Sequence, residues 1–240
     1  MMRGSLLRAS AVVSACVGLS VLAGCGSDYE ECPSGAACVP WTGPVTAAPG
    51  SGNVVRDPAQ LSAGLLAATD LPGDFAVVPP STEPDGPAVP EKALTDPPDC
   101  ARLLSPISQQ WPGSAAAASV QFAGPSFATI DIDAASYPDT ALAPAFDALQ
   151  AQPRRCASYS GEDEDVRIEY RAAALSQPSA GDAGTAFTVT ATSEGLTLTS
   201  ATSIVQVGNT LVQVVVTAPE VVDPGVLSDL TAAQVRKLRG

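Results

Sequence analysis

The feature that most restricts the fold is a series of alternating segments in the second half of the chain. Apolar and polar residues alternate there with a period of two, the pattern of β-strands with two different faces. The alternating segments cover residues 166–171, 187–192, 196–207 and 211–217. Turn residues separate the last three of them, at Glu194-Gly195 and Gly208-Asn209. Consecutive strands with short links predict an antiparallel sheet.

Further elements are expected around these strands. Residues 118–122 and 127–133 predict two earlier strands, and residues 100–104 a short helical turn. Three helices are expected, over 57–71, over 141–150 and from Asp223-Pro224 onward, because each has an apolar stripe and two begin with an Asp-Pro cap. We expect all three to cover one face of the sheet. The predicted class is α+β, an antiparallel sheet with helices at the start, middle and end of one domain, 57–240.

Two segments rich in proline and small residues interrupt this pattern. Residues 25–56 show no periodicity and predict a flexible tether. Residues 77–98 hold several prolines and predict a long surface loop within the domain.

The domain resembles a known family, the extracellular sensor domains of PknH-type receptor kinases and their free-standing relatives among actinobacterial lipoproteins. The resemblance rests on the order and spacing of short motifs, which include Leu65-Leu66 with Leu71-Pro72, residues 99–104, Cys156, residues 205–209 and residues 233–238. It implies an antiparallel sheet packed with helices, disulfide support and a cleft for an unidentified ligand. Because the chain shows no kinase domain and no spanning helix, we do not expect it to signal across a membrane by itself.

The N-terminus resembles a bacterial lipoprotein signal. Arg3 and Arg8 precede an apolar run, residues 9–24, which leads into Cys25 through Leu22-Ala23-Gly24. The run is shorter than the roughly 20 apolar residues that a spanning helix needs. The resemblance implies that residues 1–24 are removed and that Cys25 carries a lipid on the outer face of the cell membrane. The alternative is a plain secretory signal with a cysteine there by chance.

The sequence has six cysteines, of which Cys16 would be removed with the signal and Cys25 would carry the lipid. The other four remain in the mature chain. An even number in an oxidising compartment predicts two disulfides, and four cysteines allow three pairings. We favour Cys32–Cys38 and Cys100–Cys156, because the first pair lies in the tether and the second in the domain. Zinc is disfavoured because the spacings are not paired CxxC motifs.

Charge and composition exclude several functions. The net charge is −13, and it becomes −15 once the signal and its two arginines are removed, so nucleic acid is not an expected partner. The chain has no histidine, which removes Ser-His-Asp and Cys-His catalysis. No cofactor is expected.

Carboxylates are therefore the remaining acid–base groups. Asp131 and Asp133 lie two residues apart on an expected strand and share one face, which is solvent or else a paired-carboxylate or cation site. The run Glu162-Asp163-Glu164-Asp165 predicts a solvated hairpin loop, with calcium as the alternative.

Two other motifs have simpler interpretations. Residues 124–128 resemble a nucleophile elbow only faintly, and a strand entry is the better interpretation. Trp111 is an ordinary core or loop residue, or else lies at the rim of a cleft.

We expect a lipid-anchored, non-catalytic envelope protein whose domain binds a small molecule, a lipid or a glycan. The alternatives are an envelope scaffold acting through protein partners and an enzyme that uses carboxylates alone. The residues of a ligand site cannot be named from the sequence.

Overall fold

The computed structural model describes residues 39–240 except 51–54, 80–93, 164 and 220. The helices within these residues are α1 (Pro58–Gly64), α2 (Ile107–Gln110), α3 (Asp139–Arg155) and α4 (Pro224–Arg239), with short 3-10 turns η1 (Ala68–Asp70), η2 (Pro98–Arg102) and η3 (Pro125–Phe127). The strands are β1 (Ala76–Val77), β2 (Leu94–Asp96), β3 (Ala116–Ala123), β4 (Thr129–Ser136), β5 (Ser158–Asp163), β6 (Val166–Ala174), β7 (Ala183–Ser193), β8 (Leu196–Val207) and β9 (Thr210–Ala218).

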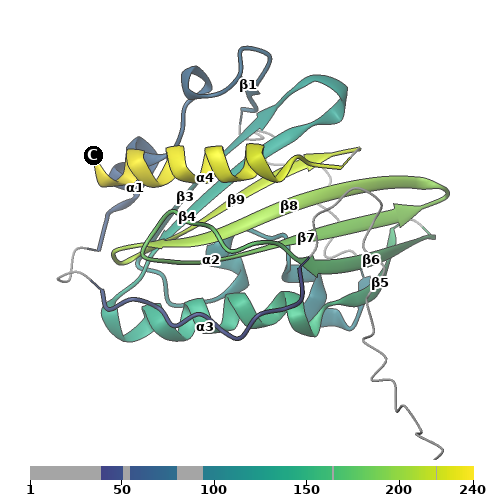
Figure 1. Ribbon diagram of the computed structural model, residues 1–240, viewed down its shortest axis with the longest axis horizontal. Helices are drawn as coiled ribbons and strands as arrows, with labels where there is room; N and C mark the ends of the chain where they lie inside the picture. The colour runs from purple at the N-terminus through teal and green to yellow at the C-terminus, as the bar shows by residue number, and fades with distance from the viewer. Residues whose placement is uncertain (1–38, 51–54, 80–93, 164, 220) are drawn as a thin grey trace, which may run out of the picture. The chain divides into compact units, whose positions relative to one another are not determined.

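All these strands form one antiparallel sheet in the order β1-β3-β4-β9-β8-β7-β6-β5-β2 (Figure 1). Strands β5 to β9 follow one another as a meander, and β9 then pairs with β4 of the β3–β4 hairpin. The α+β class and the antiparallel sheet are confirmed. None of the helices in the described residues is long and apolar enough to cross a membrane.

Helices cover both faces of the sheet, so the expectation that they share one face is wrong. Helices α1 and α4 pack on one face, and α3 with α2 packs on the other (Figure 1). The cause lies in the central strands β8 and β9, where residues 199–207 and 210–216 are all buried, whichever face their side chains point to. Strands that are buried on both faces need a cover on each.

The N-terminal helix is shorter than expected. It begins at the predicted cap, where Asp57 accepts a hydrogen bond from the backbone of Gln60, but it ends at Gly64. Beyond it, the buried side chain of Gln234 donates to the carbonyl of Gly64 and accepts from the N–H of Leu66. This amide on α4 satisfies the backbone groups that a longer helix would have paired internally.

Residues 39–50, within the stretch expected to be a tether, lie along α3 (Figure 1). The amide of Gln150 donates to the carbonyl of Val45 and accepts from its N–H, both at 2.8 Å. The amide of Gln206 makes the same two bonds, also at 2.8 Å, with Ala48. The strap, as we call residues 39–50, is thus held by two buried glutamine amides. Further hydrogen bonds join it to the domain at Val39, Thr42 and Gly43.

The proline-rich stretch is partly built into the sheet. Its ends form β1 and β2, which are the two opposite edges, while residues 80–93 lie outside the described residues. The expected turn near residue 100 is η2, and a disulfide joins Cys100 in η2 to Cys156 at the end of α3. This is the pairing that the sequence favoured. Cys25, Cys32, Cys38 and residues 1–24 lie outside the described part of the chain.

Candidate functional site

Strand β4 presents different chemistry to the two faces of the sheet. Ile130 and Ile132 point to the core beneath α1 and α4. Because side chains alternate along a strand, Asp131 and Asp133 point together to the opposite face, as the sequence predicted. That face carries α3, but α3 covers only part of it.

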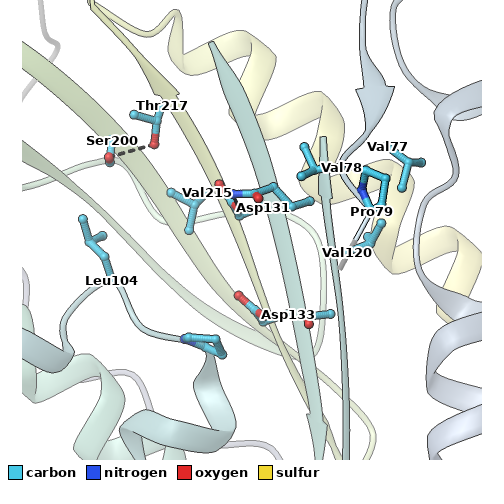
Figure 2. A pocket seen from close by; sticks show the side chains of 13 residues that line it. Val77, Val78, Pro79, Leu104, Val120, Asp131, Asp133, Ser200, Val215 and Thr217 are labelled. Atoms are coloured by element: carbon cyan, nitrogen blue, oxygen red, sulfur yellow. Dashed lines mark hydrogen bonds between the residues drawn. The ribbon is translucent and has the colours of Figure 1, made fainter. Parts of the chain in front are cut away.

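A cleft of about 840 Å³, called the sheet cleft below, lies over the remaining part. Its floor is made of side chains from four neighbouring strands (Figure 2). These are Ser119 and Gln121 of β3, Asp131 and Asp133 of β4, Val215 and Thr217 of β9, and Ser200 of β8.

Apolar side chains flank the floor. Leu104, between η2 and α2, stands on one side of the carboxylates, and residues 77–79 stand on the other (Figure 2). Pro106, two residues after Leu104, also lines the cleft. The backbone N–H of Val78 donates to the carbonyl of Gln121, which fixes the second wall against β3. The cleft therefore combines a polar floor with apolar walls, the composition of a small-molecule site.

Asp131 is well supplied with hydrogen-bond donors. Gln121 donates to its Oδ1 at 2.6 Å and Thr129 donates to its Oδ2 at 3.0 Å. Burial nevertheless raises the pKa of Asp131, because the partly dehydrated ionised form is disfavoured more than these donors stabilise it.

Asp133 is the more unusual of the two carboxylates. It is only 8% exposed, and burial, with a further contribution from the charge of Asp131, raises its pKa to about 7. Neither Lys nor Arg occurs among the described residues that line the sheet cleft. At neutral pH Asp133 is thus poised between a hydrogen-bond donor and an anion.

Hydroxyl groups continue the polar floor toward β8. The hydroxyls of Ser200 and Thr217 lie 2.8 Å apart and share a hydrogen bond (Figure 2). The floor therefore offers carboxylate and hydroxyl oxygens to a ligand. Within the residues that the structure describes, no three Cys, Asp or Glu side chains cluster closely enough to hold a metal ion.

The other candidate residues lie elsewhere. Trp111 directly follows α2 and is 37% exposed. It lines a smaller cavity, of about 350 Å³, together with residues of α3. Glu162 and Asp163 end β5 and are exposed, and Asp165 follows in the turn to β6. Residues 124–128 form the connection of the β3–β4 hairpin around η3, where Phe127 is 88% exposed. The structure brings none of these residues to the sheet cleft.

Sequence reasoning missed most of the cleft lining. Ser200 and Thr217 appeared only as polar positions in strands, and Leu104 only as the last residue of an expected helical turn. Pro106 was not singled out at all. Their common feature is their position at the part of one sheet face that no helix of the described residues covers, and no local pattern encodes that position. Alternation along β9 and β8 gives the orientation of Ser200 and Thr217 but does not show where the cover of α3 ends.

Comparisons with known proteins concern the fold. No known family model matches the chain, and no curated protein matches it. The crystal structure of the extracellular domain of PknH from Mycobacterium tuberculosis matches 78% of this chain and 99% of its own length, with 16% sequence identity and a TM-score of 0.51. An uncharacterised protein from Mycobacterium smegmatis, the Rv0999 ortholog, matches 72% of this chain and 93% of its own length, with 16% identity and a TM-score of 0.41. The chain is therefore similar in fold to the extracellular domain of PknH.

Proposed function

We propose that this chain is a lipid-anchored protein of the cell envelope whose domain binds a small molecule, a lipid or a glycan without catalysing a reaction. The observation that carries the binding role is the sheet cleft. Its volume of about 840 Å³ falls within the range of small-molecule sites, roughly 300 to 1,000 Å³. Seven of its 13 lining residues are apolar, and the other six form a polar floor. A protein that acted only as a scaffold would have no need of such a cleft.

The chemistry of the cleft supports binding rather than catalysis. The sequence has no histidine to act as a base. The two carboxylates of the cleft, Asp131 and Asp133, come from one strand and stand side by side on the floor. In enzymes that use carboxylates alone, such as glycosidases, the two catalytic carboxylates flank the reacting bond from both sides.

The location rests on the signal that ends at Cys25. Cleavage after residue 24 and lipidation of Cys25 would leave the domain on the outer face of the membrane, where two acyl chains anchor a protein stably. The fold it shares with an extracellular domain agrees with that location.

We predict that Cys25→Ala releases the protein from the membrane or leaves its precursor uncleaved. Fractionation and intact-mass measurement distinguish the two results. A mature, membrane-bound alanine variant would show that the anchor is not a lipid on Cys25.

The binding role is tested by native mass spectrometry of the protein extracted gently from its own membrane. We expect added mass, beyond any lipid on Cys25, that is lost on heating. The variant Ser119→Trp fills the cleft from an exposed position on its floor and should abolish the added mass. Thr197→Trp, at an exposed position of β8 outside the cleft, is the matched control and should keep it.

A bare mass in every preparation would contradict the proposal and favour the envelope scaffold, with chemical crosslinking to find its protein partner. Added mass that survives Ser119→Trp would place the ligand outside the sheet cleft.

A further inference from the structure

Asp133 is a buried carboxylate for which no hydrogen-bond partner occurs among the described residues. Across the sheet it faces Ser119 of β3 and Gln213 of β9. Gln213 does not serve it, because its amide oxygen accepts from Gln110 at 2.7 Å and its nitrogen points to the carbonyl of Ser105, 3.4 Å away. The residue is only 8% exposed and still lines the sheet cleft. Its free hydrogen-bonding capacity is therefore directed at whatever occupies the cleft.

The surroundings of Asp133 are uniformly short of positive charge. Asp131 stands next to it on the same floor, and the described lining holds neither Lys nor Arg. A buried carboxylate with no partner is costly when ionised, and that cost is recovered when a cation with hydrogen-bond donors arrives. The chain as a whole is strongly acidic, which draws cations toward it over longer distances.

We propose that the ligand of the sheet cleft carries a cationic nitrogen, an ammonium or a guanidinium group, that binds Asp133 while an apolar part lies between the walls. This inference rests on the proposed binding function and specifies the ligand class. The nitrogen would donate to Asp133, and the apolar part would contact side chains such as Leu104, Val78 and Val215. Ser200 and Thr217 remain for further polar groups of the ligand.

A metal ion fits the site less well than an organic cation. Calcium takes six to eight oxygen ligands, often with several carboxylates, and Asp131 already accepts two hydrogen bonds from its neighbours. The apolar walls would have no role around a bare ion. An anionic ligand would meet two carboxylates with no compensating charge.

The test is a fragment screen by NMR with equal numbers of cationic, neutral and anionic members. Binding in the cleft is read from the methyl signals of Val78 and Val215, which line it. The screen is run at about pH 8, above the Asp133 pKa. We expect cations to dominate the fragments that shift these signals.

If no fragment of any class shifts them, the binding function itself is contradicted. Hits without an excess of cations overturn only the present inference.

A matched series then isolates the charge, using phenethylamine, phenethyl alcohol and hydrocinnamate, which share an apolar body. We expect the amine to bind about tenfold more tightly than the alcohol. The variant Asp133→Asn should remove that preference while the alcohol still binds. The control Asp229→Asn changes an exposed carboxylate on α4 and should leave the preference intact. A preference that survives in Asp133→Asn, or an amine no tighter than the alcohol, overturns the inference.

Discussion

At the scale of single residues, the buried carboxyl group of Asp133 links the stability of the protein to pH. Its pKa is about 7 in the folded protein and about 4 in an unfolded chain, so the folded state binds more protons between these values. Stability falls with rising pH wherever the folded state binds more protons. We predict that the free energy of unfolding declines from about pH 4 to pH 7 by a few kcal/mol, since each pKa unit corresponds to about 1.4 kcal/mol.

Asp133→Asn removes the titrating group while keeping its shape, so it should flatten this decline and stabilise the protein at pH 8. Urea unfolding at several pH values measures the effect. Part of the slope should remain, because the pKa of Asp131 is also raised. Asp229→Asn should leave the slope as it is. An unchanged slope in Asp133→Asn would show that this carboxylate is not the buried group described above.

The sequence could predict that Asp131 and Asp133 share a face, because alternation in a strand is a local property. It could not predict their burial. That depends on residues outside strand β4, such as Leu104 and Pro106 in the connection between η2 and α2, and on how much of the sheet face α3 covers. Solvent was therefore a reasonable expectation for a face that holds a buried carboxylate.

Among elements, the segment before the sheet is held by glutamines rather than by strand pairing. Gln150, Gln206 and Gln234 are each at most 2% exposed, and each amide both donates to and accepts from the backbone of residues 45–66. A backbone N–H and a carbonyl that lose such a partner while buried cost about 1 to 3 kcal/mol each.

We predict that Gln206→Ala loosens the strap at Ala48 while the sheet stays folded. Hydrogen exchange should rise in residues 44–50, and proteolysis there should become faster, because both hydrogen bonds that hold Ala48 are lost at once. Gln109→Ala, at an exposed position of α2, is the control. If exchange rises equally over the whole domain, or does not rise at all, Gln206 does not hold the strap locally.

The predictability of the elements followed the strength of their local signals. The six expected strands appear as β3, β4 and β6 to β9, because their alternation is long. Strand β5 (Ser158–Asp163) was not predicted. Only Tyr159 and Gly161 of it are buried, so its sequence shows no clear alternation of apolar and polar residues. β1 and β2 are only two and three residues long. They form because they pair with β3 and β5, which local sequence patterns do not show. Where Gln234 reaches the end of α1, a tertiary contact overrides helix propensity.

At the scale of the whole molecule, the sheet separates two cores that hold different elements. The core under α1 and α4 contains Phe122 and Ile132, and the core under α3 contains Phe146 and Phe187. The sequence predicted the class but placed the helices on one face. The apolar run of β9, which includes Leu211, Val212 and residues 214–216, was the available signal, since it puts apolar side chains on both faces of the strand. β8 gave no such signal, because half of its twelve residues are Thr, Ser or Gln.

The disulfide Cys100–Cys156 belongs to the second core only, so its loss should affect the two faces unequally. It ties η2 to the end of α3 and closes a loop with a sequence separation of 56, for which the chain-entropy model gives about 4 kcal/mol. We predict that the double variant Cys100→Ala/Cys156→Ala lowers the free energy of unfolding by an amount of that order. The backbone amide of Leu104, which follows η2 and lines the sheet cleft, should exchange its hydrogen faster, as should the amides at the start of α2.

The core under α4 should keep its protection in this variant under native conditions, because no contact of the disulfide reaches it among the described residues. Hydrogen exchange of α4 against η2 and α2 measures the contrast. Wild-type protein in reductant should reproduce the variant's pattern in these regions. Equal loss of protection on both faces would mean that the two cores unfold as one unit, and that the wall of the sheet cleft is held by the whole fold rather than by this bond.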